Sequence, residues 1–228
     1  MQIKIFETLK QKGYKGIAIV LMLATVFTVM LIIARVVYSG THAFAFLIWN
    51  LFLAWIPFWI VRFYDKFEKK HKSLPYLIVF SGCWLLFLPN APYIVTDLFH
   101  LYPKYPVPLW YDLLLLMTAA WTGLMLGLFS LLNMQRIISR KYSASAGWIF
   151  TILSIIASAF GVYIGRFLRW NSWDIITAPK AILKDIALIF LHPGQNHGTY
   201  ILVAVLSVFL LFSYLVINLI INNKEFSN

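Results

Sequence analysis

An aspartate and a histidine, Asp97 and His100, lie three positions apart in a polar string that follows a proline-rich break. If the chain is helical from Tyr93 onward, these three side chains share one face, where the carboxylate and the imidazole are neighbours. Such a pair can act as a general base with its orienting partner, or supply two ligands of a metal ion. The alternative is that the same groups form a polar cap, which hydrogen-bonds the backbone interrupted after Pro89. Asp97 and His100 are therefore candidate catalytic residues, with the structural interpretation left open.

Two arginines three positions apart, Arg166 and Arg169, stand in a second polar string that ends at Asp174. The spacing predicts that both guanidinium groups point to one side of a helix end. Guanidinium groups bind phosphate or carboxylate through paired hydrogen bonds, so both residues are candidates for anion binding. The alternative is that they pair with Asp97, Asp112 or Asp174. The residues expected to support the two strings are Asn90, Tyr93, Asn171 and Asp174.

Two further histidines, His192 and His197, lie in a loop that contains glycine. They could complete a metal site with His100 only if the loop approached it, and we expect no metal site. The chain has no phosphate-binding loop and no GxSxG or HExxH motif. The sequence therefore assigns neither an enzyme activity nor a cofactor.

The composition is that of a membrane protein. Of 228 residues, 61% are hydrophobic and 12% are charged, and the mean hydropathy is +0.81. A soluble domain is about 45–50% apolar and about 25% charged. The contrast excludes a water-soluble enzyme and a nucleic-acid-binding domain, although the net charge is +11. We expect membrane lipids and no nucleic acid as partners, and no protein partner is indicated.

Six apolar runs are long enough to serve as transmembrane helices, each of which takes about 20 mostly apolar residues. They predict an all-α, polytopic membrane protein of one domain (residues 1–228), with spans at residues 16–34, 42–61, 74–88, 109–132, 147–165 and 200–221. Prolines end the third span early. Two short amphipathic helices, at residues 93–101 and 175–191, are expected on the outer face.

The basic residues predict the orientation, because Lys and Arg accumulate in cytoplasmic loops. With a cytoplasmic N-terminus, thirteen of the 19 Lys and Arg residues flank the inner ends of the spans and six flank the outer ends. Both termini are therefore expected in the cytoplasm. The two polar strings then lie on the outer side.

The central parts of the six spans contain no Asp, Glu, Lys, Arg or His, and Asn50 is the most polar residue there. Ion-coupled transporters usually keep such groups at depth, so this observation disfavours them. Two glycine pairs, Gly123 with Gly127 and Gly161 with Gly165, have a spacing that lets helix backbones approach closely. They predict close packing of the fourth and fifth spans.

Two segments of the sequence resemble a known family: FLPNAPYIVTDLFHL (residues 87–101) and GRFLRWNSWD (residues 165–174). Together with the order of the hydrophobic runs, they are similar to the bacterial membrane proteins grouped as domain of unknown function 1361. The resemblance implies a multi-pass protein of the bacterial cell membrane. Because the family has no established activity, it implies no catalytic residues.

Three functions remain open at this point. The first is an integral membrane protein whose outer polar strings brace the fold or bind an anionic group. The second is a membrane enzyme that acts on a lipid or polyprenyl-phosphate headgroup. The third is a small-molecule transporter or channel, with Asn50 and Cys83 lining its path. Convergence of Asp97, His100, Arg166 and Arg169 on a cavity would favour the second, and tight mutual pairing would favour bracing.

Overall fold

The computed structural model describes residues 2–68, 74–104 and 106–222. Within these ranges the chain is helical and has no β-strand, which confirms the predicted fold class. The first helices are α1 (Gln2–Ser39), α2 (Phe46–Glu68), α3 (Leu74–Phe87), α4 (Asn90–Tyr93) and the 3-10 helix η1 (Ile94–His100). The remaining helices are α5 (Leu109–Lys141), α6 (Ala144–Phe167), α7 (Asp174–Thr177), α8 (Pro179–Leu191), the 3-10 helix η2 (Pro193–Gln195) and α9 (His197–Asn222).

Six helical segments of the described chain are long and apolar enough to cross a membrane, as predicted. Helices suit this environment because each satisfies its own backbone hydrogen bonds without water. The six candidate spans are Lys15–Ser39, Phe46–Phe67, Leu74–His100, Leu109–Lys141, Ala144–Phe167 and His197–Ile221. Four basic residues behind the predicted orientation, Lys69, Lys70, Lys72 and Lys224, lie outside the described residues.

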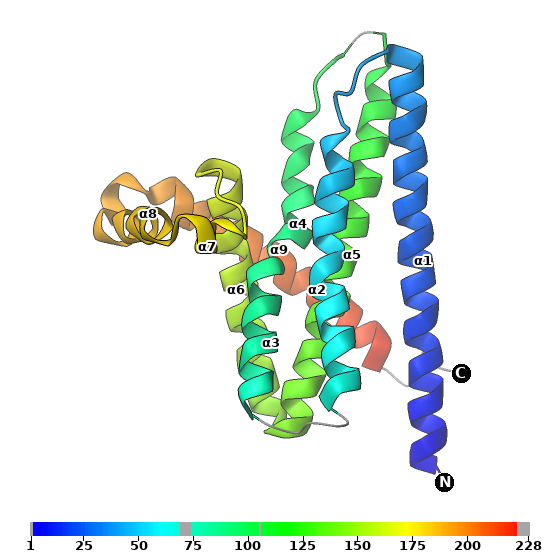
Figure 1. Ribbon diagram of the computed structural model, residues 1–228, viewed down its shortest axis with the longest axis vertical. Coiled ribbons are helices and arrows are strands. Elements are labelled where there is room, and N and C mark those ends of the chain that lie inside the picture. The colour runs from blue at the N-terminus through cyan, green and yellow to red at the C-terminus, as the bar shows by residue number, and fades with distance from the viewer. Residues whose placement is uncertain (1, 69–73, 105, 223–228) are drawn as a thin grey trace.

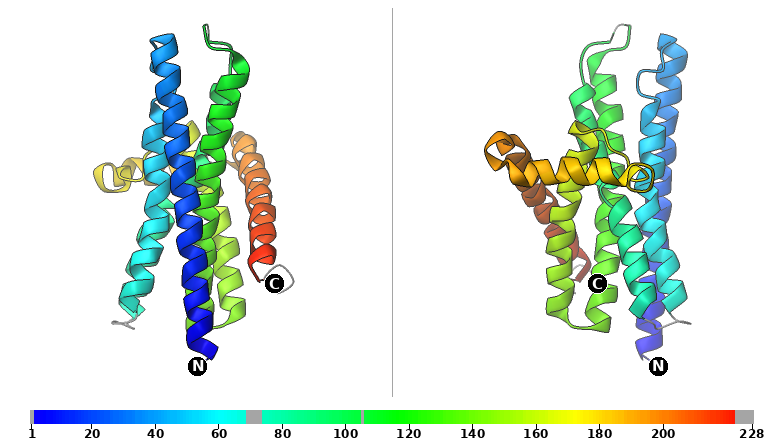
Figure 2. Two further views of the ribbon diagram at one scale, coloured as in Figure 1. Left: turned by 90° about the vertical axis from the view of Figure 1, so that its right-hand side faces the viewer. Right: turned by 60° about the vertical axis from the view of Figure 1, so that its left-hand side comes forward.

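Helix α5 lies at the centre of the bundle. It contacts α1, α2, α4, η1, α6 and α9, and two buried apolar clusters pack along it. Helices α1 and α9 lie at the periphery and expose many large apolar side chains, as lipid-facing helices do (Figures 1 and 2). Helix α1 begins and α9 ends at the same end of the bundle, which fits an even number of crossings (Figure 1).

The third span is broken between α3 and α4, where Pro89 and Pro92 lack the N–H groups of a regular helix. The amide of Ala91 bonds the carbonyl of Leu88 at 3.1 Å, so the carbonyl of Phe87 lacks its helical partner. The Asn90 side chain replaces that partner, because its Nδ2 donates to the Phe87 carbonyl at 3.0 Å. Side chains thus complete the backbone hydrogen bonds of the break.

The glycine pairs contact this broken segment. The sequence predicted instead that they lie where the fourth and fifth spans meet. Helices α5 and α6 do pack together. However, a Cβ at Gly123 would lie 2.7 Å from the carbonyl oxygen of Ala91, and one at Gly127 would lie 2.9 Å from the Ala91 Cβ. A Cβ at Gly161 would meet the ring of Pro89. The glycines therefore make room for the Pro89–Tyr93 region on both sides rather than for each other's helix.

The segment at residues 93–101 is not the separate surface helix that its amphipathic pattern predicts. It forms η1, which packs against α5, α4 and α2 and buries Ile94, Thr96 and Asp97. Helices α3, α4 and η1 together make one candidate span, Leu74–His100. Asp97 therefore lies inside the third spanning segment rather than beyond it.

Helices α7 and α8 form an arm that runs across the bundle axis beside α6 (Figures 1 and 2). The sequence predicted one amphipathic helix over residues 175–191, and the structure divides it at Ala178. This residue has φ −140° and ψ 50°, which is not helical, and it precedes Pro179. A residue before proline disfavours the helical conformation, which accounts for the division.

Candidate functional site

Arg166 is the centre of a polar cluster inside the bundle. Its Nη2 forms an ion pair with Oδ1 of Asp97, and its Nε donates to Oγ1 of Thr96 at 2.9 Å. Its Nη1 lies 3.1 Å from Nε2 of His100, which accepts because a guanidinium can only donate. The plane of the guanidinium covers the ring of Tyr93, with 4.1 Å from Cζ to the ring centroid. Each of its three nitrogens therefore has a partner.

Three spanning segments contribute to this cluster. A 3-10 helix has three residues per turn, so Asp97 and His100 lie one above the other on η1 and both reach Arg166, in the last turn of α6. Asn50, in the second turn of α2, donates its Nδ2 to Oδ2 of Asp97 at 2.9 Å. The side chain of Asp97 is 1% exposed and that of Arg166 is 12% exposed. The cluster thus ties α2, η1 and α6 together.

The predicted pair of Asp97 and His100 is bridged by Arg166. Both oxygens of Asp97 have partners, Arg166 and Asn50, and Nε2 of His100 accepts from the same guanidinium. The ion pair neutralises the charge of Arg166, and the hydrogen bonds compensate for its burial. These hydrogen bonds link α2, η1 and α6. The catalytic role of Asp97 and His100 and the anion-binding role of Arg166 stay predictions.

Arg169 does not join the cluster. Helix α6 ends at Phe167, so the predicted alignment of both arginines on one helix end is wrong. Arg169 has a left-handed backbone conformation, with φ 61°, and its side chain is exposed. Among the described residues, no hydrogen bond or ion pair involves its guanidinium.

The supporting residues fall into two groups. Asn90 donates its Nδ2 to Oγ of Ser172 at 3.0 Å, and Ser172 donates to the carbonyl of Leu86 at 3.1 Å. These bonds join the broken third span to the string after α6. Asp174 instead begins α7, where it accepts from the backbone N–H of Asn171 at 2.7 Å.

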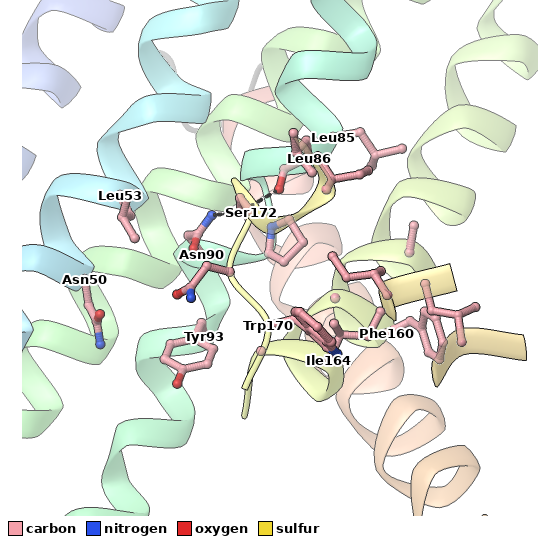
Figure 3. A pocket seen from close by; sticks show the side chains of 18 of the residues that line it. Asn50, Leu53, Leu85, Leu86, Asn90, Tyr93, Phe160, Ile164, Trp170 and Ser172 are labelled. Atoms are coloured by element: carbon pink, nitrogen blue, oxygen red, sulfur yellow. Dashed lines mark hydrogen bonds between the residues drawn. The ribbon is translucent and has the colours of Figure 1, made fainter. Parts of the chain in front are cut away.

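A cavity of about 310 Å³, here called the lateral cavity, lies beside the cluster (Figure 3). It is partly open, and it is lined by α2, the break in the third span, α6, the string after α6 and the arm. Its polar wall consists of Asn50, Asn90, Tyr93, Asn171 and Ser172. The other lining residues are apolar or glycine, and they form the apolar wall; among them are Phe160, Ile164, Trp170, Ile182 and Ile186.

A hydrogen bond holds the arm beside this cavity. Trp170, in the string after α6, donates its Nε1 to Oδ2 of Asp185 on α8 at 2.8 Å. Trp170 lines the cavity together with Ile182 and Ile186 of the same helix. The arm therefore forms part of the apolar wall.

A second buried ion pair, between Arg35 and Asp112, was missed by sequence reasoning. Arg35 donates Nε to Oδ1 of Asp112 at 2.7 Å and Nη2 to Oδ2 at 3.1 Å, and both residues are buried. It also donates Nη1 to Oγ1 of Thr41 at 3.0 Å. The pair joins the ends of α1 and α5. The sequence contains a hint of this pair. Arg35 lies at the end of the first predicted span and Asp112 at the start of the fourth, and both ends are expected on the outer side of the membrane.

The histidines of the last loop do not approach the cluster. Nδ1 of His192 lies 3.3 Å from the carbonyl oxygen of Leu188, and Nδ1 of His197 lies 3.0 Å from that of Pro193. In the part of the chain that the structure describes, no three His, Cys, Asp or Glu residues are grouped to hold a metal ion.

Comparison with known proteins gives one match. No curated protein and no solved structure matches the chain. The model of a protein family of unknown function, DUF1361, matches residues 49–214. The matched range begins in α2, ends in α9 and contains the polar cluster and the lateral cavity. The chain therefore belongs to the DUF1361 family.

Proposed function

We propose that this protein is an integral membrane protein that binds the polar end of an amphiphile in the lateral cavity. The observation that carries the proposal is that the cavity is mostly apolar and has five polar side chains in its lining. Ligand sites are typically concave, mostly apolar and about 300–1,000 Å³ in volume, with a few polar groups that orient the ligand. A cavity of about 310 Å³ suits a lipid headgroup and the start of its chain.

The polar cluster supports binding rather than catalysis. Asp97, His100 and Arg166 bond one another and do not line the cavity. Asn50 and Tyr93 connect the two features, because each lines the cavity and also contacts the cluster. In this proposal the cluster holds the polar wall in position.

The proposed location is a bacterial cell membrane, with both termini in the cytoplasm. The excess of Lys and Arg at the inner ends of the predicted spans supports this orientation. Asn50 lies in the second turn of α2 and Arg166 in the last turn of α6, so the cavity then opens toward the outer half of the bilayer.

Native mass spectrometry of the protein purified in a gentle detergent tests the proposal. The wild type is expected to retain one lipid molecule per chain. Ala157→Trp places a large ring in the cavity from an exposed position of α6, so it should lose this lipid. Ala204→Trp is the matched control, because Ala204 is exposed on α9 and does not line the cavity. Equal lipid retention by both variants would contradict the proposal.

A further inference from the structure

The polar wall of the lateral cavity is uncharged. It consists of three amides, a phenol and a hydroxyl, and no carboxylate, Lys or Arg lines the cavity among the described residues. Figure 3 shows Asn50, Asn90 and Tyr93 on one side and Phe160, Ile164 and Trp170 on the other. The polar wall can therefore bind a ligand through hydrogen bonds but not through an ion pair.

The hydrogen bonds already made leave both acceptors and donors free in this wall. Asn90 uses both N–H groups of its amide, on the Phe87 carbonyl and on Ser172. Asn50 and Asn171 each donate one N–H to a carboxylate, Asp97 and Asp174. In the described structure no donor reaches Oδ1 of any of the three asparagines. Three carbonyl oxygens, one N–H each of Asn50 and Asn171, and the phenol of Tyr93 are thus available to a ligand that both donates and accepts hydrogen bonds, as a hydroxyl group does.

A phosphate group does not match this wall. A buried anion requires a compensating cation, and no Lys or Arg lines the cavity among the described residues. The nearest buried guanidinium, Arg166, is neutralised by Asp97, and its face is covered by Tyr93. A phosphate would have to displace Asp97, which Asn50 also holds.

The size of the cavity limits what enters it. A volume of about 310 Å³ corresponds to about ten water molecules at about 30 Å³ each. This space accommodates a small headgroup and the first methylenes of a chain, while the rest of the chain passes outward along the apolar wall.

We propose that the lateral cavity selects an uncharged, hydroxyl-bearing headgroup, such as that of an acylglycerol or a glycolipid. This inference rests on the proposed function and names the ligand class of the same cavity. Glycerol and sugar headgroups share the relevant chemistry, because several hydroxyl groups donate to the asparagine carbonyls.

The test is a native mass spectrometry titration in an ether detergent that carries no sugar. The probes are mono-oleoylglycerol, an alkyl glucoside and oleoyl lysophosphatidic acid. Mono-oleoylglycerol or the glucoside should bind once to the wild type and to Ala204→Trp, and at least tenfold more weakly to Ala157→Trp. Whichever of the two binds more tightly identifies a glycerol or a sugar headgroup. Lysophosphatidic acid should bind equally weakly to all three proteins.

A variant that gains binding of an anionic lipid tests whether missing charge, rather than the shape of the cavity, excludes phosphate. Ile186→Lys adds a cation to the apolar wall at a half-buried position of the arm, and it should increase binding of lysophosphatidic acid at least tenfold. Ala187→Lys is the control, because this neighbour is exposed and does not line the cavity. An equal gain from both variants would overturn the argument that missing charge excludes phosphate.

Two outcomes distinguish the two proposals. If the wild type binds lysophosphatidic acid more tightly than both neutral probes, and Ala157→Trp loses that binding, the inferred ligand class is overturned while the amphiphile-binding function stands. If Ala157→Trp and Ala204→Trp bind every probe alike, both are overturned.

Discussion

At the scale of single residues, the buried Arg35 and the partly buried Arg166 are neutralised in different ways. Arg35 takes both oxygens of Asp112, and this pair joins α1 to α5. Arg166 takes one oxygen of Asp97 and leaves the other to Asn50, so the carboxylate joins three segments. Asp97 is therefore the residue through which α2, η1 and α6 are coupled, and its loss should affect all three.

Asp97→Ala should strongly destabilise the protein. The variant leaves the guanidinium of Arg166 buried without a counter-ion, which typically costs about 3–5 kcal/mol. Thermal unfolding in detergent measures the effect. The double variant Asp97→Leu with Arg166→Met removes both charges and should recover most of the loss. If the double variant is no more stable than Asp97→Ala, the ion pair is not the cause.

Asp174 should show a dependence on pH. The backbone N–H of Asn171, and then the side chains of Asn171 and Thr177, hold the pKa of Asp174 below its usual value. A carboxyl group with a lowered pKa in the folded state stabilises that state above its unfolded-state pKa of about 3.9. This contribution is lost as the pH falls through the lower, folded-state pKa.

The melting temperature of Asp174→Asn should therefore lie below that of the wild type at pH 7. The difference should shrink as the pH falls below about 4, because the wild-type carboxyl group then becomes neutral as well. A difference in melting temperature that stays constant from pH 7 to pH 3 would show that the charge of Asp174 plays no part.

At the scale of elements, the broken third span depends on close backbone contact. Pro89 and Ala91 lie against glycines of α6 and α5, so the break is held from both sides. The side chains of Asn90 and Ser172 then satisfy the carbonyls of Phe87 and Leu86. The position of η1, and with it that of Asp97, follows from this packing.

Gly123→Ala should destabilise the protein by about 1–3 kcal/mol, as overpacking does. The added Cβ would lie 2.7 Å from the backbone carbonyl oxygen of Ala91, which cannot rotate away. Gly82→Ala is the matched control, because nothing lies within 4 Å of a Cβ there and the site is helical. It should be neutral or stabilising by up to about 1 kcal/mol. Equal melting temperatures for the two variants would contradict the role of Gly123.

The sequence predicted some of these elements correctly and others only in part. Hydrophobic length alone predicted six spans, because a bilayer admits few alternatives to a helix. Pro89 predicted the break, but the amphipathic pattern of residues 93–101 does not distinguish a lipid surface from a neighbouring helix. The glycine spacing predicted a close backbone contact but not the segment that makes it. Pairing of Arg166 with Asp97 was one of the alternatives that the sequence left open, and the structure shows it. Choosing it, or pairing Arg35 with Asp112, required knowledge of which spans are neighbours.

At the scale of the whole molecule, the arm lies where α6 ends, and α1 and α5 extend beyond this level (Figures 1 and 2). Helix α6 runs from Ala144 to Phe167, and the side chain of Ser143, just before it, caps its first turn. Positions at the two ends of α6 therefore report opposite sides of the membrane. The chain has one cysteine, Cys83, so its replacement gives a background for labelling.

In a Cys83→Ala background, Gln195→Cys should react with a membrane-impermeant maleimide in intact cells, and Ser145→Cys should react only after permeabilisation. Both positions are exposed, Gln195 in η2 and Ser145 in the first turn of α6. The expectation follows from the excess of basic residues near the end of α5 that connects to α6. The reversed pattern would place both termini outside and turn the cavity toward the inner leaflet. Labelling of both cysteines in intact cells would contradict a membrane crossing by α6.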